Sequence, residues 1–315
     1  MIEAQKEIYN IDSERAVRRF YVDIHRLANK NKKSKTNESF HTYTVDGVCF
    51  SKARTITEIP AGEGDELYVD TIPIELTDEF IDVLRRDVKI FYLRRIGILA
   101  RRRKDTGLSK TNRNDIKAMM GIESGLFIEI DVDFLVIRRL SAAFRSLLRT
   151  HSSLLNRAKA LQGTERRILM RLVKTTEKAI NVMARLIVTE AERRMPAYRK
   201  VVEDLRISGD NHLLTREALV EVLLYVNRSI SYKQLRKFIG LFPGRKGVDK
   251  FYNKPARSAL SRLTAAVLNN AHHRAKDEYK LLRRIWTIVK NRNSGEDWGH
   301  RDRQRRKTLG GRCPD

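Results

Sequence analysis

Two runs of mostly apolar residues, spaced for contact between long helices, constrain the fold of this chain most. In each run the residues recur at alternating steps of four and three, which is the spacing of the contact positions in a coiled coil. Leu140, Phe144, Leu147, His151, Leu154, Ala158 and Leu161 form the first run, and Leu169, Leu172, Thr176, Ala179, Met183 and Leu186 form the second. Gly163 separates them, so the pattern predicts a long helical hairpin that packs on itself or on a second subunit.

The residues before these helices have the pattern of an α/β domain. Short β-prone runs occupy 20–24, 41–45, 48–51, 67–72 and 88–93. Asp46–Gly47 between two of them is typical of a hairpin turn. Residues 77–86 predict a helix with Thr77 as N-cap and with Phe80, Ile81 and Leu84 facing inward. Residues 28–39 and 101–114 read as basic loops, a helix begins at Asp115, and 127–130 is ambiguous. Strands that alternate with helices indicate an α/β fold.

The residues after the hairpin predict a small helical domain. A helix capped by Thr215 is expected at 213–226 and another at 232–239. A last helix starts near Pro255, runs to about Lys290, and has an inner face of Leu260, Leu263, Val267 and Ala271. From residue 291 the chain is rich in Arg and poor in apolar residues, which predicts a disordered basic tail. The predicted domains are therefore 16–130, 131–205 and 206–290, followed by the tail at 291–315.

The net charge indicates the kind of partner. The 315 residues contain 64 Lys and Arg against 39 Asp and Glu, a net charge of +25. Such an excess favours a polyanion, above all nucleic acid, and predicts binding that weakens steeply with salt. The alternative is a solubilising or ribosome-like surface. A membrane surface is less favoured, because the basic residues are spread over the whole chain.

Other features favour a cytoplasmic protein, associated with the nucleoid if its partner is DNA. There is no run of about 18 apolar residues, so no transmembrane helix is expected. The N-terminal residues lack the apolar centre of a secretory signal. Only two cysteines are present, Cys49 and Cys313, and neither a disulfide nor a zinc site is expected from them.

The basic segments supply candidate nucleic-acid contacts. The candidates are Lys30, Lys32, Lys33, Arg101, Arg102, Arg103, Lys104, Lys110, Arg113, Arg245 and Lys246. In many proteins such segments are solvated loops, but the net charge favours phosphate contact here. Few aromatic residues are interleaved with them, so stacking on a single strand is not indicated.

Four stretches, in this order, resemble motifs of the DEDD-type insertion-sequence transposases. These are RuvC-like recombinases guided by a bridge RNA, and the Piv-type invertases belong with them. The stretches are Tyr21-Val-Asp-Ile-His-Arg26, Tyr68-Val-Asp-Thr71, Lys110-Thr-Asn-Arg-Asn-Asp115 and Lys233-Gln-Leu-Arg-Lys-Phe-Ile-Gly-Leu-Phe-Pro243. The resemblance covers about residues 18–285. It implies an RNase H-like domain at 16–130, a coiled-coil hairpin that forms a homo-oligomer, and a helical transposase-type domain at 206–290.

The resemblance also implies a catalytic metal site. Asp23, Asp70 and Asp115 match the acids that hold Mg²⁺ or Mn²⁺ in this family, and two such ions can clamp the attacking and leaving oxygens of a phosphodiester. The chain departs from the family in three places. Asp70 stands where the family has Glu, and Asn112 stands where it has a further acid. The family's serine nucleophile has no counterpart between Gly240 and Arg257, where Tyr252 offers a hydroxyl.

Three interpretations follow. The first is a transposase-derived protein that binds DNA or structured RNA and has weakened or lost catalysis. The second is an active, metal-dependent transposase or recombinase that cuts DNA. The third is a basic scaffold in a ribonucleoprotein particle, whose helices only mimic the family's signature.

Overall fold

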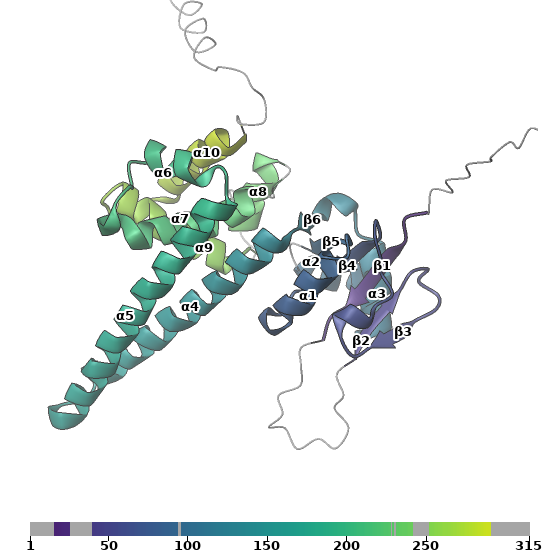
Figure 1. Cartoon of the computed structure of the whole chain (residues 1–315), viewed down its shortest axis with the longest axis horizontal. Helices are drawn as coiled ribbons and strands as arrows, with labels where there is room; N and C mark the ends of the chain where they lie inside the picture. Colours follow the sequence, from purple (N-terminus) through teal and green to yellow (C-terminus); the bar gives the residue numbers. More distant parts are fainter. Residues whose placement is uncertain are drawn as a thin grey trace, which may run out of the picture. The chain divides into compact units, whose positions relative to one another are not determined.

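The computed structural model describes residues 16–25, 40–93, 96–227, 229, 231–241 and 252–290. The chain forms two compact units, Met1–Asp131 and Val132–Asp315 (Figure 1). The division lies one residue from the predicted boundary between 130 and 131. The predicted basic loop at 28–39 and the predicted tail at 291–315 lie outside the described residues. Among the described helices, none is both long enough and apolar enough to cross a membrane.

The first unit contains a mixed sheet of six strands, which confirms the predicted α/β class. The strands are β1 (Arg19–Asp23), β2 (His41–Thr44), β3 (Ser51–Ala53), β4 (Glu66–Val69), β5 (Lys89–Leu93) and β6 (Phe127–Ile130). Their order in the sheet is β3-β2-β1-β4-β5-β6. β1, β4 and β5 pair in parallel, whereas β2 with β1, β3 with β2, and β6 with β5 pair antiparallel.

The residue pattern of the central strands explains why they are buried on both faces. Alternate residues point to opposite faces of a strand. On one face Tyr21, Tyr68 and Phe91 lie side by side in register, with ring centroids 5.0 and 4.8 Å apart. This aromatic row packs against a core that includes Leu99 of α2 (Ile96–Asp105) and Met119 of α3 (Asn112–Met120). On the other face the alternate residues Phe20, Val22, Leu67, Val69 and Ile90 are all buried.

The hairpin between β2 and β3 is wider than the sequence predicts. The second strand starts at Ser51 rather than at Val48, which is 79% exposed. The Asp46 carboxylate accepts hydrogen bonds from the backbone N–H groups of Val48 and Cys49, each at 2.8 Å. These bonds hold the residues after Gly47 in a loop, so they do not continue the ladder.

Two further predictions in the first unit are wrong. Thr77 is the first residue of α1 (Thr77–Leu84) and not its N-cap, because its hydroxyl donates to the carbonyl of Ile74 at 2.7 Å. Phe80 and Ile81 are buried as expected, whereas Leu84 is half-buried. The segment 101–114 is not one loop, since α2 continues through Asp105. Arg and Lys are good helix formers, and Leu99 anchors the helix in the core.

The second unit is helical and is built around α7 (Leu213–Val226). Its helices are α4 (Val132–Lys159), α5 (Gly163–Arg194), α6 (Tyr198–Asp204), α7, α8 (Tyr232–Ile239), α9 (Lys254–Val267) and α10 (Ala275–Lys290). Most residues of α7 are buried, and α7 contacts α4, α5 and α9 (Figure 1). Two buried acids on α7 pair with arginines of its neighbours. Glu221 pairs with Arg145 of α4, and Glu217 pairs with Arg262 of α9.

The helices α4 and α5 are joined by residues 160–162 and pack against each other. On α4, Phe144 and Ala158 are buried as predicted. On α5 the predicted contact positions are wrong by one residue. The buried positions include Val173, Ile180, Ala184 and Ile187, while Leu172 and Leu186 are 47% and 44% exposed. α5 carries two neighbouring apolar stripes, and the packed stripe is the one richer in β-branched residues.

Two predictions about the last helices also need correction. α7 begins at Leu213 with His212 as N-cap, so Thr215 does not cap it. The predicted single helix from Pro255 is two helices, α9 and α10, and Ala271 is exposed in the connection between them. Asn269 ends the first of these with a φ of 48°. Asn tolerates this left-handed conformation better than most residues, so the break can form there.

Candidate acidic site

Asp23 and Asp70 lie at the same edge of the sheet. Asp23 is the last residue of β1, and Asp70 directly follows β4. Because these strands are neighbours and parallel, their carboxyl ends meet. The side chains are buried, with exposed fractions of 7% for Asp23 and 6% for Asp70. The backbone N–H of Ile24 donates to the Asp70 carboxylate at 3.3 Å, which fixes Asp70 against the residue that follows Asp23.

The electrostatics of Asp70 show that its charge is costly here. Burial raises the pKa of Asp70 to about 7, and the nearby charge of Asp23 adds to the rise. The hydrogen bond from Ile24 opposes it. A buried carboxylate beside a second one favours either a proton or a bound cation. The pair therefore has the chemistry of a cation site.

Asp115 lies in the first turn of α3, and the charge of Asp23 affects its pKa. α3 starts after Thr111, whose hydroxyl accepts from the N–H of Asn114 at 3.2 Å. Burial raises the pKa of Asp115, Arg103 opposes the rise and Asp23 adds to it. The Arg103 guanidinium lies 2.9 Å from the Asp115 carboxylate. The charge of Asp23 thus acts on Asp115, and the Asp115 carboxylate forms an ion pair with Arg103. Asn112 is the exposed first residue of α3.

Two histidines adjoin the acids, and neither has a predicted role. His25 Nε2 lies 3.2 Å from the Asp23 carboxylate, and this contact raises the pKa of His25. The backbone N–H of His25 donates a hydrogen bond to Nδ1 of the His41 ring at 3.2 Å. His41 is buried, which lowers its pKa to about 4, and His25 contributes to the lowering. The antiparallel pairing of Asp23 with Thr42 places His41 here, and a sequence without strand register cannot reveal it.

The predicted nucleic-acid contacts divide into three groups. Arg101, Arg102, Arg103 and Lys104 lie on α2 instead of a loop, and Arg103 is largely buried in its ion pair. Lys110 and Arg113 are exposed around the start of α3, where the Arg113 guanidinium lies 5.4 Å from the centre of the Phe50 ring. Lys30, Lys32, Lys33, Arg245 and Lys246 lie outside the described residues.

Within the described ranges, no three His, Cys, Asp or Glu side chains come close enough to hold one metal ion together. The acidic site is therefore defined by the pair Asp23 and Asp70, with Asp115 held by Arg103. No protein-family model matches this chain, and no curated protein matches it either.

Proposed function

We propose that this chain is a nucleic-acid-binding protein derived from a DEDD-type transposase, with weakened or lost catalysis. The observation that carries the proposal is the buried pair of acids, Asp23 and Asp70, at the carboxyl ends of two neighbouring parallel strands. An acid at each of these strand ends is what the resemblance to RuvC-like transposases implies.

The sheet order supports an RNase H-like interpretation of the first unit. Three successive strands pair antiparallel, and the next two continue the sheet from β1 in parallel. A mixed sheet with acids at the ends of neighbouring parallel strands is compatible with the RNase H-like domain that the resemblance implies, and β6 adds a further antiparallel strand at the edge. In the second unit, α4 and α5 follow the first unit along the chain and pack against each other, which supports the coiled-coil hairpin that the resemblance implies.

Asp23 and Asp70 fit a divalent cation such as Mg²⁺ or Mn²⁺, because a cation would offset the cost of two buried negative charges. When bound, such an ion polarises a phosphodiester and neutralises the charge that develops on it. Asp115 could join this pair only after its ion pair with Arg103 opens. That engagement supports weakened catalysis, as do Asn112 and the lack of a serine between Gly240 and Arg257.

The net charge of +25 supports a polyanionic partner. Binding to DNA would place the protein in the cytoplasm at the nucleoid. α5 supports a homo-oligomer, because an outward stripe of Ile168, Leu172, Thr175, Ala179, Val182 and Leu186 repeats the four–three spacing of a coiled coil. Four of these residues are exposed large apolar side chains, and a second copy of the chain would cover them.

An active enzyme is the second candidate function, favoured by the coupling of Asp115 to Asp23. One experiment tests both. The protein is purified at low salt, and its bound nucleic acid is characterised with RNase and DNase and then sequenced. We expect a defined population of RNA or DNA. A chain that purifies without nucleic acid, and that binds none added at low salt, would contradict the proposal.

The catalytic arm adds the recovered RNA, supercoiled DNA and Mg²⁺ or Mn²⁺ to wild-type protein and to Asp23→Ala. We expect no strand cleavage or transfer by either protein. Metal-dependent strand transfer by the wild type that is lost in Asp23→Ala would establish the active enzyme instead. Asp82→Ala, at an exposed acid on α1, is the matched control.

A further inference from the structure

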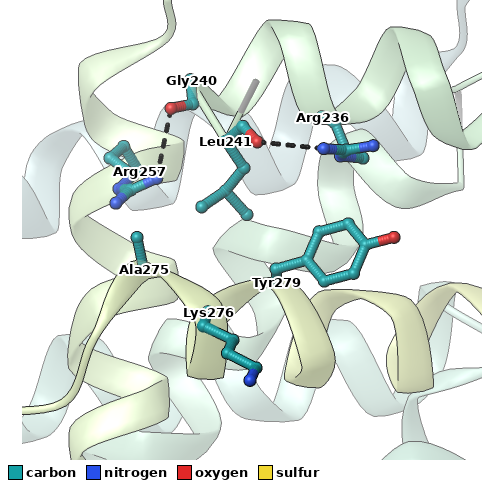
Figure 2. Close-up of a pocket in the computed structure, with 7 residues that line it drawn as sticks. All are labelled: Arg236, Gly240, Leu241, Arg257, Ala275, Lys276 and Tyr279. Carbon is teal, nitrogen blue, oxygen red and sulfur yellow. Dashed lines mark hydrogen bonds between the residues drawn. The ribbon is translucent and has the colours of Figure 1, made fainter. Parts of the chain in front are cut away.

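The second unit contains a pocket of about 340 Å³ between the end of α8 and the starts of α9 and α10. Figure 2 shows the side chains around it. Three of them are cations: Arg236 from α8, Arg257 from α9 and Lys276 from α10. Leu241, Ala275 and Tyr279 supply apolar surface. Of the described residues that line this pocket, none is acidic.

The turn after α8 shapes the pocket. Gly240 ends the helix with a φ of 80°, and a Cβ there would lie 2.7 Å from the ring of Tyr252. Only glycine combines this left-handed backbone conformation with so close an approach of Tyr252 without strain. The turn presents two carbonyls that position the arginines, as the dashed lines in Figure 2 mark. Arg236 donates to the carbonyl of Leu241, and Arg257 donates to that of Gly240, each at 3.4 Å.

The three cations differ in their surroundings. Arg257 forms an ion pair at 2.5 Å with Glu278, which is buried and also bonds His273 at 3.0 Å. The charge of Arg257 is thus largely balanced behind the pocket. The Arg236 guanidinium lies 4.5 Å from the centre of the Tyr279 ring, which holds the planar group in one orientation. Lys276 is exposed in the first turn of α10, where the helix dipole is also positive.

We propose that this pocket binds a phosphate group. A guanidinium and an ammonium both attract phosphate oxygens by their charge and by donating hydrogen bonds to them. The volume exceeds that of a phosphate alone, and Leu241 and Tyr279 offer apolar surface for the sugar or base attached to it. Whether the phosphate belongs to a polynucleotide rests on the proposed function; the phosphate chemistry of the pocket does not.

The test compares Lys276→Ala and Arg236→Gln with Lys280→Ala. Lys280 is exposed one turn further along α10 and does not line the pocket, so its removal matches the loss of one charge. Binding is measured in EDTA, which removes any contribution of metal at the acidic site. One arm uses fluorescently labelled RNA and DNA oligonucleotides over a range of salt concentrations. The other uses a mononucleotide and inorganic phosphate in calorimetry.

We expect Lys276→Ala to weaken oligonucleotide binding about fivefold to tenfold near 0.1 M salt and to lower the salt slope by about 0.7–0.9, the effect of one lost phosphate contact. Arg236→Gln should act in the same direction, and Lys280→Ala should leave the slope unchanged. If only the mononucleotide or phosphate arm shows this difference, the pocket binds phosphate but does not contact the polynucleotide. If, in addition, the wild type binds no oligonucleotide at low salt, the proposed nucleic-acid function fails while the pocket stands. Equal behaviour of Lys276→Ala and Lys280→Ala in both arms would overturn the phosphate site.

Discussion

Asp70 connects the stability of the first unit with its proposed chemistry. Its carboxylate is buried beside Asp23, so its ionised form is disfavoured in the folded chain. A residue that costs stability and remains at the end of a central strand is the kind of residue that functional sites retain. Asp70 is therefore the most informative single position for mutation.

Replacing Asp70 with Asn should stabilise the protein at high pH. The folded pKa is about 7, against an ordinary value of 3.8, so the folded state holds the proton more tightly than the unfolded state. The ionisation of Asp70 therefore lowers the stability of the wild type as pH rises from about 4 to 7, and the variant lacks this contribution. We expect Asp70→Asn to be more stable by about 1–3 kcal/mol at pH 8 and similar to wild type near pH 4.

Urea denaturation at the two pH values measures this difference, with Asp82→Asn as the control at an exposed acid. Added Mg²⁺ or Mn²⁺ should narrow the gap at pH 8, because it stabilises only the chain with both carboxylates. A wild type that is as stable as Asp70→Asn at both pH values would contradict the buried acid pair.

Gly240 is the second informative residue. Gly240→Ala places a methyl group against Tyr252 and forces a left-handed conformation, so we expect a loss of about 1–3 kcal/mol in the free energy of unfolding. Gly163→Ala is the matched control, because Gly163 has a φ of 63° but its nearest neighbour to an added Cβ is a flexible Glu165 oxygen at 3.8 Å. The difference between the two variants isolates the contact with Tyr252. Equal losses would show that Tyr252 does not pack on the turn.

At the scale of elements, α5 has two apolar stripes. Within the described part of the chain, one stripe is buried and the other is largely exposed. The inner stripe includes Val173, Ile180 and Ile187, and the outer stripe includes Leu172, Val182 and Leu186. Such a helix can pack on both sides. The outer stripe is the surface on which the proposed self-association depends.

Val182→Asp should therefore weaken self-association. Val182 is 67% exposed, so the substitution leaves the fold intact and places a charge within the outer stripe. We expect sedimentation to show a larger monomer fraction, with a dissociation constant of self-association raised by about tenfold or more. The reason is that an unpaired charge is costly at an interface. Asn181→Asp adds the same charge next to the stripe and should change little. A wild type that is monomeric at high concentration would contradict the proposed oligomer.

The elements show how far the sequence could predict this fold. The central strands and most helices were predictable, because buried apolar runs and helical spacing are local signals. The choice between the two stripes of α5 was not, because it depends on which face α4 and α7 cover. The helical state of 101–105 was missed because basic residues suggest a loop, although they form helices well.

The acidic site was predictable only in part. The resemblance to the transposase family groups Asp23 with Asp70, and the parallel pairing of β1 with β4 accounts for their position at one edge of the sheet. The pairing of Arg103 with Asp115 depends on how α2 packs beside α3, and the contact of His25 with His41 depends on the register of β1 and β2. Tertiary contacts of this kind leave no local pattern in a sequence.

At the scale of the whole molecule, the excess of positive charge is the property that most constrains function. A net charge of +25 on 315 residues destabilises a folded chain by self-repulsion, and the polyanionic partner that we propose would relieve that cost. The described cations of the pocket in the second unit and the exposed cations near α3 are the groups that we propose contact such a partner, and each compact unit contains some of them.

The salt dependence of nucleic-acid binding tests the central claim most directly. The full chain is titrated with labelled RNA and DNA at salt concentrations from about 50 to 400 mM. The logarithm of the association constant is then plotted against the logarithm of the salt concentration. We predict a linear decrease with a slope of about −5 or steeper, which corresponds to six or more phosphate contacts. No binding at the lowest salt, or a slope near zero, would contradict a nucleic-acid-binding function.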